Sequence, residues 1–255
     1  MAQFNFNGSC VWLTGASSGI GEALAYELAA RGAKVAVTAR RAEVLDALVS
    51  QIRAKGGQAW SFPGDVTNLE EMKRVVASIE SSVGPIDLAI PNAGTHVFTI
   101  PEQFNSAEYL SIMQLNFGGI LFCLEAIIPR MLERGKGALA PVASLAGYRG
   151  LPRAGAYGAS KAAAIHFLES IRFHLKTKGI TISIVNPGFV KTPLTDKNDF
   201  RMPFLIDSDK AAKIICNGIE RGKREIAFPW PFKWVLKIAR ILPDPIYERI
   251  VDRCW

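Results

Sequence analysis

Tyr157 and Lys161 stand four positions apart in the segment GAYGASKAA, residues 155–163. In a helix this spacing places both side chains on one face, one above the other. The residues between them are small, so the backbone or a sugar of another molecule could approach that face. Taken alone, the pair is either a phenol prepared for proton transfer or a surface contact between an aromatic ring and a lysine.

Proton transfer to a carbonyl oxygen is the chemistry that this pair suits. Reducing a ketone requires a hydride on carbon and a proton on oxygen, and a tyrosine can supply the proton. Its ordinary pKa of about 10 is poorly matched to neutral pH. An ammonium about 4 Å away contributes roughly 4 kcal/mol at an effective dielectric of 20, worth about three pKa units. In a catalytic site, Tyr157 would act as the general acid/base and Lys161 would lower its pKa, but the pair by itself leaves the surface contact open.

Short apolar runs that alternate with helix-period segments must position this pair. The predicted strands are Cys10–Thr14, Lys34–Thr38, Gln58–Phe62, Ile86–Pro91, Ala138–Ala143, Thr181–Val185 and Glu225–Phe228. The predicted helices cover residues 20–31, 42–54, 68–82, 106–132, 156–177 and 209–221. The alternation predicts an α/β fold with a doubly wound parallel sheet and helices on both faces. In such a fold the ligand site lies at the carboxyl ends of the strands.

A glycine-rich turn, TGASSGIGEALAYELAARG, follows the first predicted strand. Glycine permits a tight turn and close backbone approach, and the helix N-terminus presents free N–H groups to a pyrophosphate. Such a turn can serve packing alone, but its strand–turn–helix context favours a dinucleotide cofactor. The candidate contacts in this turn are Gly15, Ser17, Ser18, Gly19, Ile20 and Gly21.

The residues after the second predicted strand bear on the choice of nucleotide. NAD-binding chains commonly carry Asp or Glu there, where it holds the ribose 2′-OH. This chain reads VAVTARRAE, so Ala39 stands at that point and is followed by Arg40 and Arg41. Two guanidiniums suit a 2′-phosphate, whereas the alternative is a pair of solvated arginines at a helix start, where the helix dipole disfavours them. We expect NADP(H) rather than NAD(H).

With TGASSGIG, GDV, NAG, LN, AS and YGASK in that order, the chain resembles the short-chain dehydrogenase/reductase superfamily, in its branch of about 250 residues. The resemblance runs from about Ser9 to Phe228. It implies a single-domain Rossmann-type fold with seven parallel strands and reversible hydride transfer between a nicotinamide and an alcohol or carbonyl. We expect residues 1–229 to form the catalytic nucleotide-binding part and residues 230–255 an amphipathic helical tail of the same domain.

The resemblance also assigns site residues by position. It implies that Ser144 hydrogen-bonds the substrate oxygen and that Asn116 steadies a water that returns protons to Lys161. It places Tyr157 and Lys161 as the acid/base and its partner, with the lysine also on the nicotinamide ribose. The further implied cofactor contacts are Asp65, Val66, Asn92, Ala93, Gly94, Pro187, Gly188, Val190 and Thr192.

Two prolines depart from the family pattern. Pro91 replaces the first asparagine of the family's NNAG stretch, and Pro141 falls inside the strand that leads to Ser144. A central strand needs the backbone N–H that proline lacks. We therefore expect a bulge or altered pairing near these strand ends, which bears on the placement of Ser144.

Composition limits the remaining function classes. The 255 residues are 49% apolar, enough for a buried core, and carry 30 basic against 23 acidic residues, a net charge of +7. No reading helix or basic–aromatic pattern indicates nucleic acid, so a phosphorylated cofactor or an anionic membrane surface explains the charge better. The cysteines have no metal-ligand spacing, and we expect reduced thiols, no metal site and a cytoplasmic protein. The first strand begins too early for a signal peptide, and no uncharged apolar run is long enough to span a bilayer.

Other side chains are less informative. His96, His166 and His174 form no metal-like pair, and we expect all three to be structural or solvated. An apolar group follows the NPG motif where the family's substrate is covered, and it either forms a lid or simply packs. This group consists of Phe189, Phe200, Met202, Phe204 and Leu205.

The C-terminal segment FPWPFKWVLKIARILPDPIYERIVDRCW differs from the short ending common in the family. Lys233, Lys237 and Arg240 recur at helical spacing among apolar residues. After the Pro243–Pro245 break, a second apolar face follows, made of Ile246, Tyr247, Ile250 and Val251. Two short amphipathic helices could lie on a membrane surface or pack on the domain or on a second subunit, and we favour protein packing.

Two functions remain open. The first is an NADP(H)-dependent carbonyl reductase or alcohol dehydrogenase that acts on a lipophilic small molecule and assembles as a homodimer or homotetramer, with peripheral membrane contact as a further option for the tail. The second is a non-catalytic nucleotide sensor or scaffold on the same fold. The complete set of Asn116, Ser144, Tyr157 and Lys161 favours the first, because a sensor has no use for it.

Overall fold

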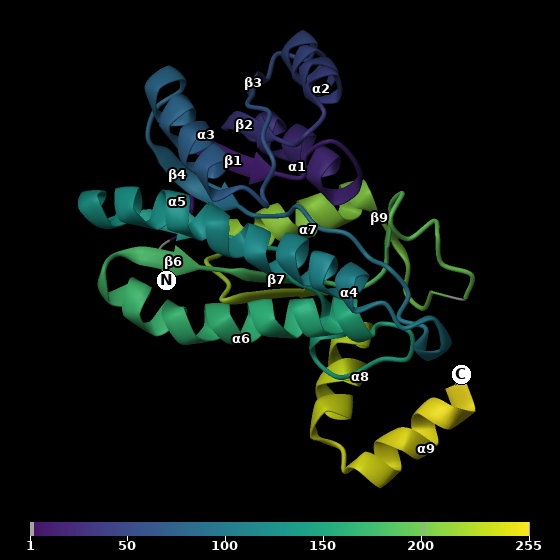
Figure 1. The fold of residues 1–255 in the computed structure, drawn as a ribbon. Helices are drawn as coiled ribbons and strands as arrows, with labels where there is room; N and C mark the ends of the chain where they lie inside the picture. The colour runs from purple at the N-terminus through teal and green to yellow at the C-terminus, as the bar shows by residue number, and fades with distance from the viewer. Residues whose placement is uncertain (1–2, 201, 255) are drawn as a thin grey trace.

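The computed structural model describes residues 3–200 and 202–254, which form a parallel sheet with helices on both faces (Figure 1). Six strands make the main sheet, in the order β3-β2-β1-β4-β5-β6. They are β1 (Cys10–Thr14), β2 (Lys34–Thr38), β3 (Gln58–Ser61), β4 (Ile86–Ile90), β5 (Gly137–Leu139) and β6 (Ile180–Ile182). The order reverses between β1 and β4, so a crevice for a ligand is expected at their carboxyl ends.

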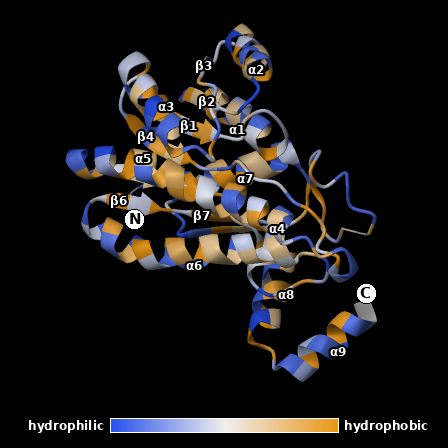
Figure 2. Cartoon of the chain, in the orientation of Figure 1, coloured by the Kyte–Doolittle hydropathy of each residue, from blue (hydrophilic) through white to orange (hydrophobic). Residues whose placement is uncertain are grey.

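Alternate residues of the strands feed two separate cores. In β1, Val11 and Leu13 pack with α1 (Gly19–Ala30), α2 (Ala42–Ala54) and α7 (Ser208–Glu220). Cys10 and Trp12 point the other way, toward α3 (Leu69–Ser82), α5 (Gly119–Arg134) and α6 (Gly155–Thr177). Because both faces are covered, the strands are apolar throughout, as the sequence predicts for a doubly wound sheet. Figure 2 shows this apolar interior and the more polar outer helix faces.

Pro141 interrupts the sheet next to the site. The backbone N–H of Ser183 donates to Leu139 O at 2.9 Å, and that of Val185 donates to Pro141 O at 3.0 Å. The bond between these two would come from residue 141, and proline has no N–H to give. The predicted strand Ala138–Ala143 accordingly ends at Leu139, and the predicted strand 181–185 divides at Ser183 into β6 and β7 (Ile184–Pro187). The altered pairing expected from this proline is confirmed.

The seventh predicted strand forms but does not join the main sheet. β10 (Glu225–Phe228) pairs in parallel with β7 in a separate two-stranded sheet. A single bridge between Val142 and Val185 links β7 to the chain after β5. The expectation of one seven-stranded sheet is therefore wrong, because the break opposite Pro141 separates β7 from β6. A third small sheet pairs β8 (Val190–Lys191) with β9 (Ile206–Asp207), which the sequence did not predict.

The helix predicted over residues 106–132 consists of three segments. α4 (Ser106–Met113) and α5 are joined by a π-helical turn, Gln114–Gly118. Apolar periodicity does not reveal such a turn, because it shifts the helix phase by a single residue. Single π-turns are frequent at functional sites, and this one carries Asn116. Among the described residues, the continuous stretch Ser106–Arg134 is long and apolar enough to cross a membrane, but it packs against α3 and α6 within the fold.

Both tail helices are present. α8 (Trp230–Ile241) packs its buried Leu236 and Ala239 on the body of the protein, and α9 (Asp244–Cys254) extends from it at an angle (Figure 1). The Nζ atoms of Lys233 and Lys237 lie 3.2 and 2.6 Å from Glu225 Oε2. These two lysines therefore face the body of the protein and do not form one outward cationic face with Arg240.

The first turn of α9 is fixed to the loop before α6. Asp244 forms an ion pair with Arg149, whose guanidinium also lies over the Tyr247 ring at 4.6 Å. The Tyr247 hydroxyl donates to the backbone carbonyl of Gly150. Large apolar side chains on the outer faces of the two helices stay exposed. They are Trp230, Trp234, Val235, Ile238, Ile241, Ile246 and Ile250.

Candidate active site

The turn after β1 has a backbone that requires glycine. Gly15 and Gly19 have positive φ angles of 66° and 59°. A Cβ atom built on Gly21 would lie 2.1 Å from Gly15 O, so the start of α1 packs directly on the turn. Ser18, the N-cap of α1, makes no capping bond through its side chain. The first N–H groups of α1 therefore remain able to bind the phosphates of a ligand.

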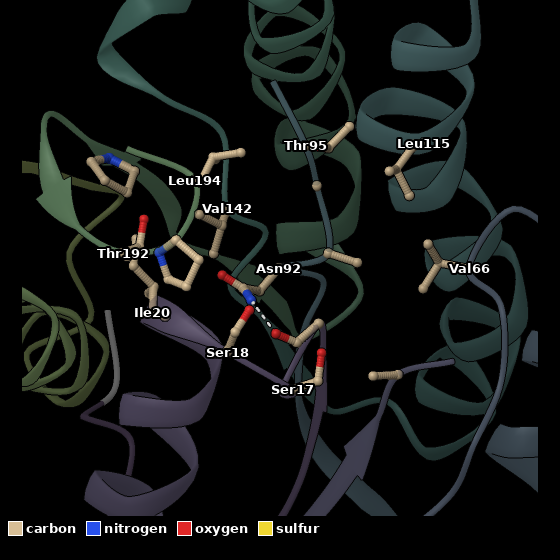
Figure 3. A pocket seen from close by; sticks show the side chains of 18 of the residues that line it. Ser17, Ser18, Ile20, Val66, Asn92, Thr95, Leu115, Val142, Thr192 and Leu194 are labelled. Atoms are coloured by element: carbon tan, nitrogen blue, oxygen red, sulfur yellow. Dashed lines mark hydrogen bonds between the residues drawn. The ribbon is translucent and has the colours of Figure 1, made fainter. Parts of the chain in front are cut away.

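A cavity of about 390 Å³ extends from this turn along the carboxyl ends of β1, β2 and β4. Figure 3 shows Ile20, Thr192 and Leu194 on one side of it and Val66 and Leu115 on the other. Each residue that the sequence suggested as a cofactor contact lines this cavity. They are Gly15, Ser17, Ser18, Gly19, Ile20, Gly21, Arg40, Arg41, Asp65, Val66, Asn92, Ala93, Gly94, Tyr157, Lys161, Pro187, Gly188, Val190 and Thr192.

The end of the cavity next to α2 is positively charged. Arg40 and Arg41 are exposed there, and Arg41 Nη2 donates to Ser17 Oγ at 3.2 Å. Asp65 is the acidic residue among the lining residues, but its Oδ1 accepts from the backbone N–H and the hydroxyl of Thr67 at 2.9 and 2.8 Å. The Asp65 carboxylate thus stabilises the turn that contains Thr67. The guanidiniums of Arg40 and Arg41 are available to an anionic group of a ligand.

Asn92 ties the glycine turn to the end of β4. Its backbone N–H donates to Thr14 Oγ1 at 3.0 Å, and its side-chain amide donates to Thr14 O at 3.1 Å (Figure 3 shows the side chain). A Cβ atom on Gly15 would lie 2.7 Å from the Cα of Ala93, so the two segments touch through their backbones. The two strand ends at the switch point are therefore held in contact.

Tyr157 and Lys161 lie on the first turns of α6, where Lys161 is buried and Tyr157 is partly buried. Lys161 Nζ donates to Val142 O at 3.0 Å and lies 5.8 Å from the centre of the Tyr157 ring. Burial lowers the pKa of Lys161 to about 8, so the ammonium is only partly charged just above neutral pH.

The expected downward shift of the tyrosine is not found. Burial raises the pKa of Tyr157, and a hydrogen bond with Ser144 acts in the opposite direction. The expectation of a pKa lowered by Lys161 in the protein alone is therefore wrong. Removal of the phenol from water is the larger influence, and the Ser144 hydrogen bond only partly offsets it.

Ser144 reaches the tyrosine in spite of Pro141. It is the N-cap of a short 3₁₀ turn, Leu145–Gly147, and its Oγ accepts from the Ala146 N–H at 3.1 Å. The hydroxyl donates to Pro187 O, at the end of β7, at 3.3 Å. The local turn, rather than the strand register, sets the position of Ser144.

The side-chain amide of Asn116 is engaged within the protein. Both amide hydrogens are engaged, because Nδ2 donates to Thr95 O at 2.9 Å and to Ser160 Oγ at 3.0 Å. Oδ1 accepts from the Thr95 N–H at 2.8 Å. Ser160 in turn donates to Tyr157 O at 2.7 Å. The side chain of Asn116 thus joins the chain after β4 to the first turn of α6. Its part in a water relay stays a prediction.

A second, apolar cavity of about 110 Å³ opens on the other side of Tyr157. Ser144 and Tyr157 form its polar end, and aromatic side chains form much of the rest. Phe189 and Phe200 of the suggested lid line it, with ring centres 5.8 Å apart. Phe204 and Leu205 are largely exposed, and Met202 lies outside the lining. Only part of the predicted lid therefore contributes to this cavity.

Sequence reasoning missed several residues of this cavity. His96 was expected to be structural or solvated, but its ring packs edge-on against Tyr157 at 5.1 Å, and burial lowers its pKa. His166 and His174 are exposed, as expected. Phe232 comes from α8, far away in sequence, and no local signal could place it in the cavity. Ser160, which the sequence presents only as a small residue between Tyr157 and Lys161, links Asn116 to the first turn of α6. Its position in the YGASK motif is the signal that could have indicated this role.

The cysteines and the possible metal ligands form no metal site within residues 3–200 and 202–254. Cys10, Cys123 and Cys216 are free and buried, whereas the side chain of Cys254 lies outside the described part of the chain. Among the described residues, no group of three His, Cys, Asp or Glu side chains could hold a metal ion.

The glycine turn, the switch-point cavity and the position of the tyrosine–lysine pair beside it match what the sequence suggested about the family. The sequence profile described as "short chain dehydrogenase" matches residues 9–201. The chain belongs to the short-chain dehydrogenase family. Members of this family of oxidoreductases bind a nicotinamide dinucleotide.

Three comparisons place this short-chain dehydrogenase among known proteins. It is 36% identical to an oxidoreductase of Myxococcus xanthus over 253 residues, 99% of each chain. It is 36% identical to "11-beta-hydroxysteroid dehydrogenase-like 2" of Arabidopsis thaliana, covering 97% of this chain and 82% of the plant protein. A solved short-chain dehydrogenase/reductase from Burkholderia phymatum, in complex with NAD, superimposes with a TM-score of 0.85 at 21% identity, covering 92% and 94% of the two chains. The last likeness concerns the fold.

Proposed function

We propose that this short-chain dehydrogenase transfers hydride between NADP(H) and the carbonyl or secondary alcohol of a lipophilic small molecule. The observation that carries the proposal is the position of Tyr157, which lines both the 390 Å³ cavity and the apolar 110 Å³ cavity. A reacting carbon placed there would meet a cofactor on one side and a proton donor on the other. The name of the Arabidopsis relative supports a lipophilic substrate.

The residues of the larger cavity fit a dinucleotide phosphate. The glycine turn leaves no room for a Cβ atom at Gly21, and the N–H groups at the start of α1 suit a pyrophosphate. Arg40 and Arg41 suit a 2′-phosphate, and the carboxylate that lines the cavity, Asp65, is engaged through its Oδ1 by Thr67. We therefore propose NADP(H) over NAD(H). A bound nicotinamide supplies the hydride and, when oxidised, a positive charge near Tyr157.

The chain's own groups would manage the proton. We propose that the Tyr157 hydroxyl gives a proton to the carbonyl oxygen and that the Ser144 hydroxyl polarises the same oxygen. Lys161 would hold the ribose and, as a cation, favour the ionised form of Tyr157. Asn116 would act by positioning α6, through Ser160 and Thr95, rather than by touching the substrate.

We also propose a cytoplasmic oligomer. Three buried free thiols suit a reducing compartment. The exposed apolar side chains of α8 and α9 suit contact with a second copy of the chain, in a homodimer or homotetramer. Contact with an anionic membrane is less well supported, since Lys233 and Lys237 are bound to Glu225.

Oxidation of NADPH in the presence of a panel of alkyl, aryl and fused-ring ketones tests the proposed reaction. Tyr157→Phe should keep the fold and NADPH affinity while lowering turnover by about 10²- to 10⁴-fold, the usual contribution of general acid–base catalysis. Near-normal turnover by this variant would contradict the role of Tyr157. NADPH binding without oxidation of any member of the panel would favour a nucleotide sensor.

A charge reversal tests the choice of cofactor. Arg40→Asp should weaken NADPH binding and favour NADH, because a carboxylate repels the 2′-phosphate and accepts from the 2′-OH. Lys178→Asp, at an exposed lysine after α6, is the matched control and should leave the ratio of the two affinities unchanged. Equal affinity of the unmodified protein for NADH and NADPH would count against the proposal.

A further inference from the structure

Phe232 brings the tail helix α8 into the substrate cavity. Its ring stacks on Phe189, with ring centres 5.5 Å apart and planes 22° from parallel. A Cβ atom built on Gly188 would lie 2.9 Å from Phe232 Cδ1 and 3.0 Å from Pro229 Cδ. The first turn of α8 therefore rests on the backbone that follows β7, next to the nicotinamide end of the larger cavity.

A network centred on Glu225 holds α8 in this position. Its carboxylate accepts from Lys237 at 2.6 Å and from the Tyr148 hydroxyl at 2.5 Å, and it pairs with Lys233 at 3.2 Å. The Tyr148 hydroxyl also accepts from Asn186 Nδ2 at 3.2 Å. Burial raises the pKa of Glu225, but the hydrogen bonds outweigh it and lower the pKa overall.

The network connects α8 to both walls of the reaction site. Tyr148 directly follows the turn that begins at Ser144, and Asn186 lies in β7 just before Pro187. Glu225 opens β10, which pairs with β7. A movement of α8 would therefore shift the Phe232 ring without altering the six-stranded sheet.

The cavity that Phe232 borders is small. At about 110 Å³ it falls well below the roughly 300–1,000 Å³ of typical ligand pockets, and below the roughly 150 Å³ that admits a benzene molecule in a protein core. Phe232, Phe189 and Phe200 fill the space that a large substituent on the carbonyl would need. Of these, Phe232 stands on a helix fixed by ion pairs rather than on a loop.

We propose that Phe232 is a specificity-determining residue that sets an upper size limit for the carbonyl substrate, and that Glu225 is the positioning residue that holds it. The proposal rests on the proposed function, because it concerns the same reaction site. It favours compact carbonyl compounds over fused-ring ones and assigns the tail helix a part in substrate choice.

Two ketones of different size test the size limit: butanone as the compact substrate and 1-tetralone as the fused-ring one. In Phe232→Ala, the ratio of kcat/KM for tetralone to that for butanone should rise at least tenfold, a change typical of one altered pocket contact. Phe232→Leu, which keeps more of the packing, should raise the ratio less. Trp234→Ala, on the exposed outer face of the same helix, should leave it within twofold. An unchanged or lower ratio in Phe232→Ala overturns the size limit.

A second measurement tests the role of Glu225 without turnover. Glu225→Gln should speed amide hydrogen exchange in α8 at least tenfold and shift the ketone ratio in the same direction as Phe232→Ala. Glu225→Asp should recover part of the protection, because it restores the charge. Unchanged exchange in Glu225→Gln overturns its positioning role.

Equilibrium binding of the two ketones separates this proposal from the proposed function. If the unmodified protein reduces no ketone with NADPH, the proposed reaction fails. Tetralone should still bind Phe232→Ala at least tenfold more tightly than the unmodified protein if Phe232 limits the cavity. No gain in tetralone binding overturns the role of Phe232 whether or not the protein is active.

Discussion

Among the described residues, Lys161 is the charged side chain that the fold buries. Its ammonium has one protein acceptor, the carbonyl of Val142, and burial lowers its pKa from 10.5 to about 8. In the proposed reaction a buried cation near Tyr157 would favour the ionised phenol, but burying the cation costs stability. Packing of α6 against the sheet and the turn around Ser144 offsets the free-energy cost of burying the Lys161 ammonium.

Stability should therefore depend on the protonation of Lys161. Between pH 8 and pH 10 the unfolded chain binds its proton more tightly than the folded one, so the free energy of unfolding should rise by about 2 kcal/mol across this range. Urea unfolding of the unmodified protein and of Lys161→Met at each pH measures the difference, and this rise should vanish in the variant.

The exposed Lys178 provides the control for this experiment. Lys178→Met should reproduce the pH profile of the unmodified protein. A Lys161→Met protein with the unmodified profile would mean that the buried ammonium carries no such cost.

At the scale of elements, the tail helix α8 completes the reaction site. The six-stranded sheet and the glycine turn are formed by residues that come before it, while Phe232 borders the substrate cavity from outside this core. Removing α8 would leave Glu225 and Tyr148 without their lysine partner and would expose the backbone at Gly188.

Ending the chain after Phe228 should give a folded protein that still binds NADPH but has lower activity on bulky substrates. Activity falls because the cavity without α8 opens to water and loses apolar contacts with the substrate. Phe232→Ala, by contrast, widens the cavity but leaves α8 in place. Calorimetric NADPH binding and turnover of the truncated protein measure the two effects. Full turnover on fused-ring ketones by the truncated protein would contradict this prediction.

At the scale of the whole molecule, the outer faces of α8 and α9 are the most apolar part of the described surface that the fold leaves unexplained. Ile241 and Trp230 on α8 are 80% and 71% exposed, and Ile246 and Ile250 on α9, which extends from α8 at an angle (Figure 1), are also exposed. Monomeric proteins rarely expose contiguous apolar patches of large size. The pairing of Lys233 and Lys237 with Glu225 leaves few cations on these faces, which favours a protein partner.

The full-length protein should therefore run as a dimer or larger species on gel filtration, and the protein truncated after Phe228 at a smaller size. Sedimentation with anionic vesicles provides the alternative outcome, since membrane contact predicts binding that weakens with salt. Salt-sensitive vesicle binding that is lost on truncation, with no change in size, would replace the dimer by membrane contact. No change in either measurement would contradict both.

The sequence by itself determined the elements whose signals are local. The α/β alternation, the glycine turn and the Tyr157–Lys161 spacing each depend on residues close together in the chain, and the structure brings the suggested cofactor contacts into one cavity. The break in strand pairing at Pro141 could also be predicted from the sequence, because a proline lacks the backbone N–H that the ladder requires.

Only the tertiary structure decided features that depend on distant neighbours. The entry of Phe232 into the cavity depends on packing between segments far apart in sequence, and the π-turn at Asn116 leaves no mark on the apolar periodicity. The pKa of Tyr157 is the clearest case. Spacing alone predicted attraction by Lys161, but the cost of burial depends on everything that surrounds both groups, and it reverses the direction of the shift.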